Sequence, residues 1–595
     1  MTAVDATLAA LGAAGLERGG LLAVAIDAAA GAALRPVAGP GPAVAVSAAD
    51  VQAVLAAVER ELGPRWGMWS SDTAVALLGL GVEVARSWDV VAVHRLLFGG
   101  WRADPARAWA RLGGLDPAAV PTDEPATSST RSPRAIPISR CAPTGTCVPT
   151  GWPGAGPRRP SGWAGGRRCS PRSWRASSSA STTWPADEEA RPAATRTAIA
   201  ESTAELLCAE LMVEGLPVGR AEMEAAIAGF VGPRPADERA AVAARAARDE
   251  AVLRHVPEGV RFDLRSPSQV KTMLRMVGLE VPDTRAWRLE GLRHEHPLVD
   301  ALLTWRKAER VATTFGYAWL DEHLGDDGRF RGEWTGSDGA AGRMTASAGL
   351  HNMPADLRSG VVAAPGHAFV RADLGQIEPR VLAAVSGDRA LARASQADDL
   401  YSPVAAELGV ERPVAKVAVL GAMYGQTTGE GARALVGLRR SYPVAMSYLE
   451  EADASAQVGR DLRTYGGRLL RMGGPGVVGL EAEAGERSAR ARAAARGRYG
   501  RNAVVQGAAA ELFKVWAVTV RARGRALGAR VVLCLHDELL VHVPVEHAEA
   551  AAAMVDEALQ EAAARWAPTG RSASSPTPRS SRPGPTPRSP PHSSY

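Results

Sequence analysis

Two segments without helical or strand periodicity divide this chain and limit where a folded core can form. The first runs from about residue 123 to 185 and the second from 567 to 595, and both are rich in Arg, Ser and Pro. Neither repeats apolar residues at the spacing of a helix or a strand. A packed core is therefore expected only in residues 1–103 and about 190–566.

The first of these segments has an unusual composition for a linker. Disordered linkers avoid Trp and Cys, yet this one contains four tryptophans and three of the five cysteines. We interpret both segments as stretches translated in a shifted reading frame; the alternative is an authentic disordered linker and tail. The five cysteines form no CxxC pair and lack the spacing of zinc ligands, so free thiols are expected.

The size and charge of the chain set broad limits. Its 595 residues exceed what one hydrophobic core usually serves, so several domains are expected. No apolar run approaches the roughly 18 uncharged residues of a membrane helix, and the first residues include an acid where a signal peptide needs basic residues. We therefore expect a cytoplasmic protein without a membrane partner. The net charge of +5 suits a polyanionic partner but does not require one.

The N-terminal region predicts a small α/β domain. LLAVAID (21–27) has the pattern of a strand. SAADVQAVLAAVERELG (47–63) and SWDVVAVHRLLFGG (87–100) are predicted to be amphipathic helices.

The first motif that could take part in catalysis or metal binding is HAFVRADLGQIEPRVLAAVSGD. Its alternating apolar residues predict a strand that ends at Asp373, and the following helix accommodates Pro379 in its first turn. A carboxylate at the end of a strand can hold a divalent cation at the rim of a sheet. Taken alone, such a junction is more often an ordinary strand-to-helix connection.

The second motif is VVLCLHDELLVHVP, which predicts a β-hairpin with His536, Asp537 and Glu538 at the bend. Adjacent acids repel each other, and a cation shared with Asp373 would give the arrangement a physical reason. The alternative is a hairpin turn with ordinary surface acids.

The third motif is ERPVAKVAVLGAMYGQTTG, a predicted helix that begins near Pro413. Arg412, Lys416, Leu420 and Tyr424 recur every fourth residue and lie on one face. Two cations at a helix N-terminus oppose the helix dipole unless an anion binds there, and a triphosphate is such an anion. A plain amphipathic helix explains only the apolar half of this face.

In this order, the three motifs resemble motifs A, B and C of family A DNA polymerases, the bacterial DNA polymerase I type. GRMTASAGLHNMP resembles the segment before motif A, and GRYGRNAVVQGAAAELFKVWAV resembles the helix before motif C. LVDALLTWRKAERVATTFGYAWLDEH resembles the helix between thumb and palm. The resemblance covers about residues 190 to 566, and the ordered set is more specific than any one motif.

This resemblance implies a multidomain α+β fold, in which a right-hand polymerase follows a small α/β ribonuclease-H-like domain of the exonuclease type. Shorter bifunctional 3′–5′ exonuclease/DNA polymerase members have this organisation. The implied segments are a degenerate exonuclease-like domain (1–103), an aperiodic linker (104–189), thumb and thumb–palm helix (190–330), palm with motif A (331–390), fingers with motif B (391–510), palm with motif C (511–566) and an aperiodic tail (567–595).

The resemblance also implies the catalytic roles. Asp373 and Asp537 would hold two Mg²⁺ ions, which activate the primer 3′ hydroxyl and neutralise charge as pyrophosphate leaves. Glu538 would be an auxiliary carboxylate, and Lys416 a proton donor to pyrophosphate. The implied partners are primer–template DNA and dNTPs, bound by a monomer.

The implied binding residues form two sets. Glu378 would occupy the space that a ribose 2′ hydroxyl needs, which favours deoxynucleotides. The nucleotide-binding set is Arg412, Lys416, Leu420, Tyr424, Gln376, Glu378 and His536. The duplex-binding set is Arg343, Arg498, Asn502 and Gln506, which would contact minor-groove acceptors shared by all sequences.

The sequence departs from the family pattern in three places. Leu420 stands where the family usually has an aromatic residue. The aperiodic tail begins where the palm usually adds a last strand, so the sheet that bears Asp537 could lose a neighbour. The front domain lacks the DxE pattern of an active exonuclease, because Asp27 is followed by alanines and only Asp72 and Asp89 remain.

We therefore expect a DNA-dependent DNA polymerase without proofreading, used in replication-associated repair or gap filling. Two alternatives remain open at this stage. One is a catalytically impaired protein that keeps the polymerase fold and binds DNA. The other is a nuclease that acts through the front domain.

Overall fold

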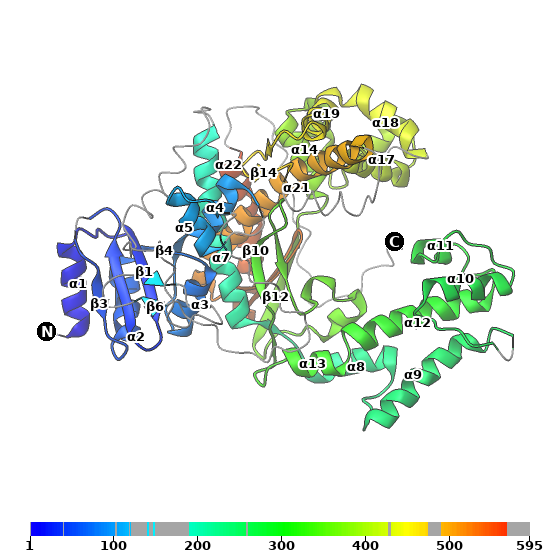
Figure 1. Ribbon diagram of the computed structural model, residues 1–595, viewed down its shortest axis with the longest axis horizontal. Helices are drawn as coiled ribbons and strands as arrows, with labels where there is room; N and C mark the ends of the chain where they lie inside the picture. The colour runs from blue at the N-terminus through cyan, green and yellow to red at the C-terminus, as the bar shows by residue number, and fades with distance from the viewer. Residues whose placement is uncertain are drawn as a thin grey trace, which may run out of the picture. The chain divides into compact units, whose positions relative to one another are not determined.

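The computed structural model describes residues 2–39, 41–100, 104–117, 120, 140–141, 147–148, 190–257, 260–425, 430–473 and 489–567. These residues form two compact units (Figure 1). Of the described residues, those within 1–213, 334–345 and 370–567 form unit 1, and those within 214–333 and 346–369 form unit 2. Most residues of the two aperiodic segments lie outside the described residues. The shifted-frame interpretation concerns these segments and therefore lies outside the described part of the chain as well.

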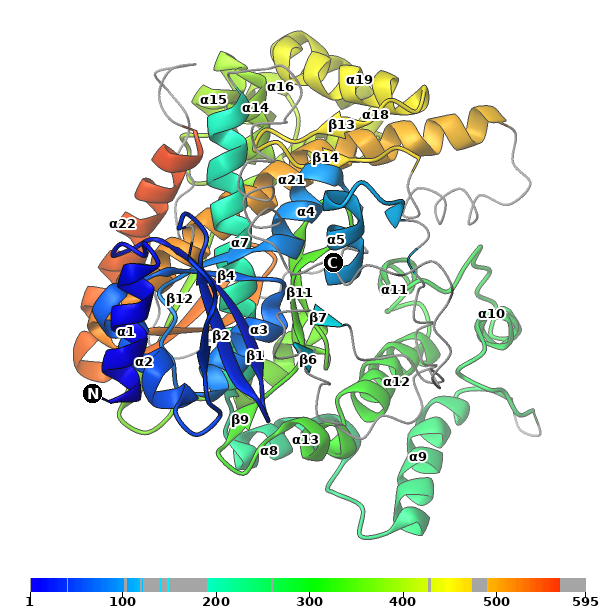
Figure 2. The same cartoon turned by 60° about the vertical axis from the view of Figure 1, so that its left-hand side comes forward.

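The front of unit 1 is a five-stranded sheet in the order β3-β2-β1-β4-β5 (Figure 2). Its strands are β1 (Leu21–Asp27), β2 (Gly31–Pro36), β3 (Val44–Val46), β4 (Arg65–Met68) and β5 (Arg86–Asp89). The first three pair antiparallel, and β4 and β5 run parallel to β1. Its helices are α1 (Ala3–Ala13), α2 (Val51–Leu62), α3 (Ser71–Gly79) and α4 (Val90–Phe98). The small α/β domain is thus present.

Two predictions for this part of the chain need correction. The stretch 87–100 is not one helix, because residues up to Asp89 belong to β5 and the helix begins at Val90. The helix α5 (Pro105–Leu112) lies inside the segment 104–189 that the sequence predicts to be an aperiodic linker. Asp104 caps α5 by accepting from the Arg107 backbone N–H at 2.8 Å. Ala108 and Leu112 of α5 belong to the same hydrophobic core as residues of β5 and α4.

The long helix α7 (Ala190–Glu214) groups with unit 1 up to Val213. Its Leu206 and Ala209 pack into the core of the front sheet, and Ala194 and Ala198 pack against α4. The predicted thumb segment 190–330 thus begins with a helix that shares a core with the front sheet. Two short strands, β6 (Arg140–Cys141) and β7 (Cys147–Val148), pair antiparallel within the first aperiodic segment.

The second sheet of unit 1 has the strand order β12-β16-β15. β12 (His367–Asp373) is the predicted strand of the first motif, and β15 (Arg530–Leu535) and β16 (Glu538–Pro544) form the predicted hairpin. Among the described residues β16 has a neighbour on each side. Residues 568–595, where a further strand was in question, lie outside them.

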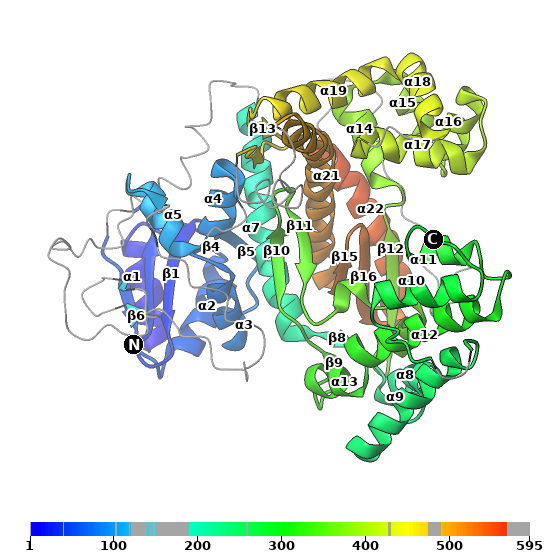
Figure 3. The same ribbon diagram turned by 45° about the vertical axis from the view of Figure 1, so that its right-hand side comes forward.

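Two helices accompany this sheet, α21 (Ala489–Gly524) and α22 (Ala548–Trp566) (Figure 3). α21 is long and apolar enough to fit a membrane span by length and composition, but its most apolar stretch is 83% buried inside the protein. Packing in the core therefore explains its apolar residues.

Six helices that pack together follow β12 and precede β15 in the sequence, and we call them the helical layer. Its helices are α14 (Ile377–Ser386), α15 (Arg389–Ala394), α16 (Tyr401–Leu408), α17 (Arg412–Tyr424), α18 (Glu430–Ser441) and α19 (Pro443–Gln457). They share one hydrophobic core with the first half of α21. Two hairpins complete unit 1: β10 (Trp334–Asp338) with β11 (Arg343–Ala346), and β13 (Leu462–Arg463) with β14 (Leu469–Leu470).

Unit 2 is mainly helical. It contains α8 (Arg220–Val231), α9 (Glu238–Leu253), α10 (Pro267–Met276), α11 (Ala286–Glu290), α12 (Pro297–Thr314) and α13 (Tyr317–His323), with β8 (Leu216–Pro217) paired to β9 (Arg329–Phe330). The predicted thumb-to-palm helix is two helices, α12 and α13, separated at Phe315–Gly316. Trp305 of α12 donates to Asp249 of α9 at 2.8 Å and joins these helices.

Candidate active site

Asp373 and Asp537 lie at the same end of the three-stranded sheet. Asp373 ends β12, and Asp537 occupies the turn between β15 and β16. The backbone N–H of Leu374 donates to the Asp537 carbonyl at 3.0 Å, so the two aspartate backbones are adjacent. His536 in the same turn has a φ of 49°, a conformation that a short turn can require. The structure thus brings together two acids that are 164 positions apart in the sequence.

Both aspartates are costly to ionise where they stand. Burial raises the pKa of Asp537 to about 6, and the nearby Asp373 adds to that effect. Burial also raises the pKa of Asp373, although the Gly375 backbone N–H opposes this by donating to its carboxylate at 2.7 Å. A divalent cation would favour the ionised form of both groups.

Glu538, which is predicted to be an auxiliary carboxylate, pairs with an arginine of the neighbouring strand. Arg371 on β12 binds its carboxylate with two hydrogen bonds of 2.6 and 3.1 Å. Among the described residues, no group of three or more His, Cys, Asp or Glu side chains is arranged to hold a metal ion. The predicted metal ligands that the structure brings together are Asp373 and Asp537.

The N-terminus of α17 corrects one part of the sequence argument. Arg412 already has an anionic partner within the chain, because the Asp399 carboxylate accepts from its Nε at 2.8 Å and from its Nη2 at 2.9 Å. The Arg412 guanidinium holds the pKa of Asp399 well below its usual range. Gln376 donates to the same carboxylate at 2.7 Å, so two predicted nucleotide-binding residues meet at Asp399.

A second group forms around Glu378. Its carboxylate accepts from Arg343 at 2.5 Å and from the Tyr424 hydroxyl at 2.9 Å. With the Gln506 amide oxygen turned toward it, Arg343 also donates to Gln506 from both terminal nitrogens at 3.0 Å. Burial and the Glu378 carboxylate raise the pKa of Tyr424 to about 12. Four residues predicted for nucleotide or duplex binding therefore form one connected network.

The remaining predicted residues lie on the expected helix faces. Lys416 and Leu420 are half-buried on the side of α17 that also bears Arg412 and Tyr424, and Leu420 packs against the helical core. On α21, Arg498 is exposed and lies two turns before Gln506, and Asn502 is half-buried and lies one turn before it. Gly425, with a φ of 70°, abuts Arg498 so closely that an added Cβ would overlap its side chain.

Sequence reasoning missed Arg380 and Asp399. Arg380 is 4% exposed, and it donates to the Gly375 carbonyl at 3.0 Å and to the Asp398 carbonyl at 2.7 Å. It thus ties the turn after Asp373 to the segment that ends at Asp399. An arginine among the apolar residues of IEPRVLAAV was the available sign, since a buried cation needs several acceptors.

The three acids of the front domain do not assemble into a site. Asp27 accepts from the Ala29 and Ala30 backbone N–H groups in the β1–β2 turn, and Asp72 is an exposed acceptor for Ser70. Asp89 is 1% exposed and caps α4 by accepting from the Ala92 N–H at 2.8 Å. Burial raises the pKa of Asp89 well above its usual value. Each of these three acids thus accepts hydrogen bonds in its own turn or helix cap.

Comparisons with known proteins agree with the geometry. The profile of DNA polymerase family A matches residues 237–568. DNA polymerase I of Chloroflexus aurantiacus is 32% identical over 304 residues, which cover 46% of this chain and 31% of that protein. The thermostable DNA polymerase I of Thermus caldophilus is 32% identical over 334 residues, which cover 51% of this chain and 38% of that protein. The chain thus spans about a third of the length of these relatives.

A more distant relative and a solved structure extend the comparison. DNA polymerase theta of Caenorhabditis elegans is 26% identical over 342 residues, which cover 51% of this chain and 20% of that protein. The POL domain of Pol1 from M. smegmatis, solved in complex with DNA primer-template and dNTP, matches with a TM-score of 0.62 and 21% identity over 94% of each chain. This likeness shows a shared mixed α+β polymerase fold. Because the family profile matches more than half of its residues, this chain belongs to DNA polymerase family A.

Proposed function

We propose that this chain is a DNA-dependent DNA polymerase that extends a primer 3′ end with dNTPs by two-metal nucleotidyl transfer. The observation that supports this most is the adjacency of Asp373 and Asp537 at one end of the β12-β16-β15 sheet, in a member of this family. The solved relative was captured with DNA primer-template and dNTP, which supports the same substrates here.

The residues present fit a magnesium site. Mg²⁺ usually keeps several waters and uses only one or two protein carboxylates together with substrate phosphates. Two half-buried aspartates, each with a raised pKa, meet that requirement. When bound, the metal would lower the pKa of the primer hydroxyl and neutralise charge on the transferred phosphate.

Protein side chains would supply the rest of the site. Lys416 and Arg412 bind the triphosphate, and Lys416 protonates the pyrophosphate oxygen that leaves. Glu378, held by Arg343 and Tyr424, limits the space next to the sugar of the incoming nucleotide. Gln506, Asn502 and Arg498, spaced by one helical turn on α21, contact the duplex.

Primer extension with Mg²⁺ tests the proposal. The chain should lengthen a primer on a template, and Asp373→Ala and Asp537→Ala should each abolish extension while leaving duplex affinity nearly unchanged. Duplex binding without extension by the unaltered chain would instead identify a catalytically impaired polymerase fold. Shortening of the primer would identify a nuclease.

A second experiment addresses Lys416. Because its charge is needed most as pyrophosphate develops, Lys416→Ala should reduce turnover more than nucleotide affinity. An unchanged rate would refute the assignment. We also propose a cellular use in replication-associated repair or gap filling, for which faster extension on short gapped duplexes than on long single-stranded templates is the expected result.

A further inference from the structure

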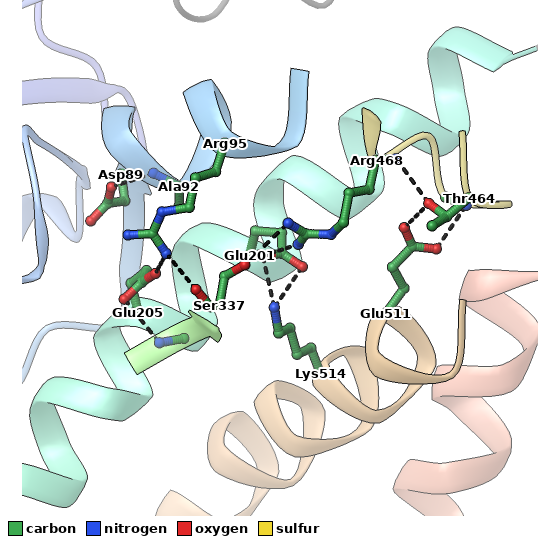
Figure 4. Close-up of polar contacts among 12 residues, drawn as sticks. Asp89, Ala92, Arg95, Glu201, Glu205, Ser337, Thr464, Arg468, Glu511 and Lys514 are labelled. Atoms are coloured by element: carbon green, nitrogen blue, oxygen red, sulfur yellow. Dashed lines mark hydrogen bonds and ion pairs between the residues drawn. The ribbon is translucent and has the colours of Figure 1, made fainter. Parts of the chain in front are cut away.

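A row of buried charged residues runs through unit 1 (Figure 4). Its centre is the Glu201 cluster, which we define as Glu201 on α7, Lys514 on α21 and Arg468 on the β13–β14 hairpin. Lys514 donates to both Glu201 oxygens at 2.8 Å, and Arg468 lies 2.6 Å from Glu201 Oε2. The exposed fraction of each side chain is 3% or less. Burying three charged side chains costs free energy even when they pair, so we look for a role of this cluster other than stability.

The cluster holds the β10–β11 hairpin on one side. Arg468 donates to the Ser337 hydroxyl of β10 at 3.1 Å. At the same turn of the hairpin, directly before β11, Gly342 has a φ of 77° and abuts the Arg468 guanidinium, so that an added Cβ would overlap it. The residue after Gly342 is Arg343, whose side chain binds Glu378 and Gln506. Arg468 is thus in direct contact with the backbone that presents Arg343.

A second glutamate on α7 holds the same hairpin. Glu205, one helical turn after Glu201, accepts from the Gly336 backbone N–H at 3.4 Å and from Arg95 at 3.0 Å. Arg95 also donates to the Ser337 carbonyl at 3.3 Å. The front domain and α7 therefore fix β10 from the side opposite to Arg468.

The hairpin that presents Arg468 is itself fixed to α21. Glu511 accepts from the Thr464 hydroxyl and, at 2.8 Å, from the Gly466 backbone N–H. Thr464 in turn accepts from the Arg468 backbone N–H at 2.9 Å. Since α21 also bears Gln506, the helix positions both neighbours of Arg343: its partner Gln506 and, through Glu511, its support Arg468.

We propose that Glu201 is a positioning residue for nucleotide selection. The Glu201 carboxylate neutralises Arg468, which packs against Gly342. This contact fixes the neighbouring Arg343, so that Arg343 holds the Glu378 carboxylate beside the sugar of the incoming nucleotide. The inference rests on the proposed polymerase function for its consequence, but its structural part does not depend on activity. Without the negative charge of Glu201, Arg468 and Lys514 repel each other, and the hairpin loses its support.

Glu201→Gln tests this with a matched control. The amide keeps the size of the side chain and removes its charge. The control is Glu210→Gln, about 13 Å further along α7, which removes an equally short pair, since Glu210 binds Arg521 at 2.6 Å with both oxygens. Both variants should lose thermal stability. Only Glu201→Gln should lower discrimination between dNTPs and rNTPs, by up to about a hundredfold, because a misplacement of about 1 Å can cost that much in rate.

Hydrogen–deuterium exchange provides a readout that needs no activity. In Glu201→Gln the amides of residues 334–346 should exchange faster than in the unaltered chain, while those of residues 530–544 should not. Glu210→Gln should leave the 334–346 amides unchanged. If the unaltered chain does not extend a primer, the proposed function fails, but this exchange result still decides the positioning role.

Two results would overturn the inference. One is unchanged exchange in residues 334–346; the other is an equal change of discrimination in Glu201→Gln and Glu210→Gln. Should Glu201→Gln not accumulate as folded protein, Ser337→Ala replaces it. This variant removes only the hydroxyl that accepts from Arg468, and discrimination should fall about two- to threefold because a single hydrogen bond is lost. No change in Ser337→Ala would also count against the positioning role.

Discussion

The Tyr424 hydroxyl donates to Glu378 Oε2 over 2.9 Å, and it joins the last turn of α17 to the first turn of α14. Arg343 holds the other oxygen of the same carboxylate at 2.5 Å. The group proposed to exclude a 2′ hydroxyl is therefore fixed from two sides, and each side can be removed separately.

Tyr424→Phe removes one of these two hydrogen bonds and keeps the ring. We expect discrimination against rNTPs to fall about three- to tenfold, since a hydrogen bond to a charged group is worth about 1.5–3 kcal/mol and Arg343 still holds the carboxylate. Steady-state incorporation of dNTP and rNTP opposite one template base measures this. Tyr442→Phe is the control, because Tyr442 is buried in the same helical layer and makes no contact with Glu378. Equal ratios in both variants would argue against the role of Tyr424.

Asp399→Asn weakens the grip on Arg412. The carboxylate competes with a triphosphate for this guanidinium, so its loss should lower KM for dNTPs about two- to fivefold, while Arg412→Ala should raise KM. Because the Arg412 side chain is 51% exposed and the Asp399 side chain 29%, water screens the pair, and the free energy of unfolding should change by about 1 kcal/mol or less. A KM that stays the same in Asp399→Asn would mean that this pair does not compete with the nucleotide.

Asp89→Ala separates a capping role from an exonuclease role. Loss of an N-cap costs about 1 kcal/mol, so the melting temperature should fall. Removal of a mismatched primer 3′ end should be undetectable before and after the substitution. The exposed Asp72 provides the control, and Asp72→Ala should leave both measurements unchanged. Mismatch removal that Asp89→Ala abolishes would show an active exonuclease and contradict our expectation.

Glu511 should make stability depend on pH. Burial raises the pKa of Glu511 from 4.5 to about 7. Between about pH 4.5 and 7, Glu511 keeps its proton in the folded chain and releases it in the unfolded chain. The stabilisation from this group is therefore complete below about pH 4.5 and is lost as pH rises through about 7. The free energy of unfolding should fall across this range by about 3 kcal/mol from this group. Denaturant unfolding at several pH values measures the slope.

Glu511→Gln should remove this part of the slope. The control is Glu561→Gln on the surface of α22, which should keep the slope of the unaltered chain. An unchanged slope in Glu511→Gln would assign the pH dependence to another group.

Local sequence patterns predicted a large part of this molecule. The strand that ends at Asp373, the hairpin around Asp537 and the shared face of Arg412 and Tyr424 are all present. These features depend on periodicities of two and 3.6 residues, which the chain displays over short windows. The helix α5 was missed because its eight residues are too few for a clear period.

The partners of charged residues could not be predicted in the same way. Arg412 pairs with Asp399 because α16, which lies between them in the sequence, packs against α17. Lys514 pairs with Glu201, which is 313 positions away in the sequence. Nothing in a local window specifies such pairs, because they follow from which helix faces meet in the core.

The sequence by itself therefore determined which residue types stand at strand ends and on helix faces, and with them the family and the two candidate metal ligands. Only the tertiary structure decided that Asp373 and Asp537 are adjacent, that Arg412 is already paired with Asp399, and that Glu201 and Arg468 support the backbone before Arg343. The physical reason is that secondary structure follows from interactions within a few residues, whereas charge pairing and burial follow from packing between distant segments.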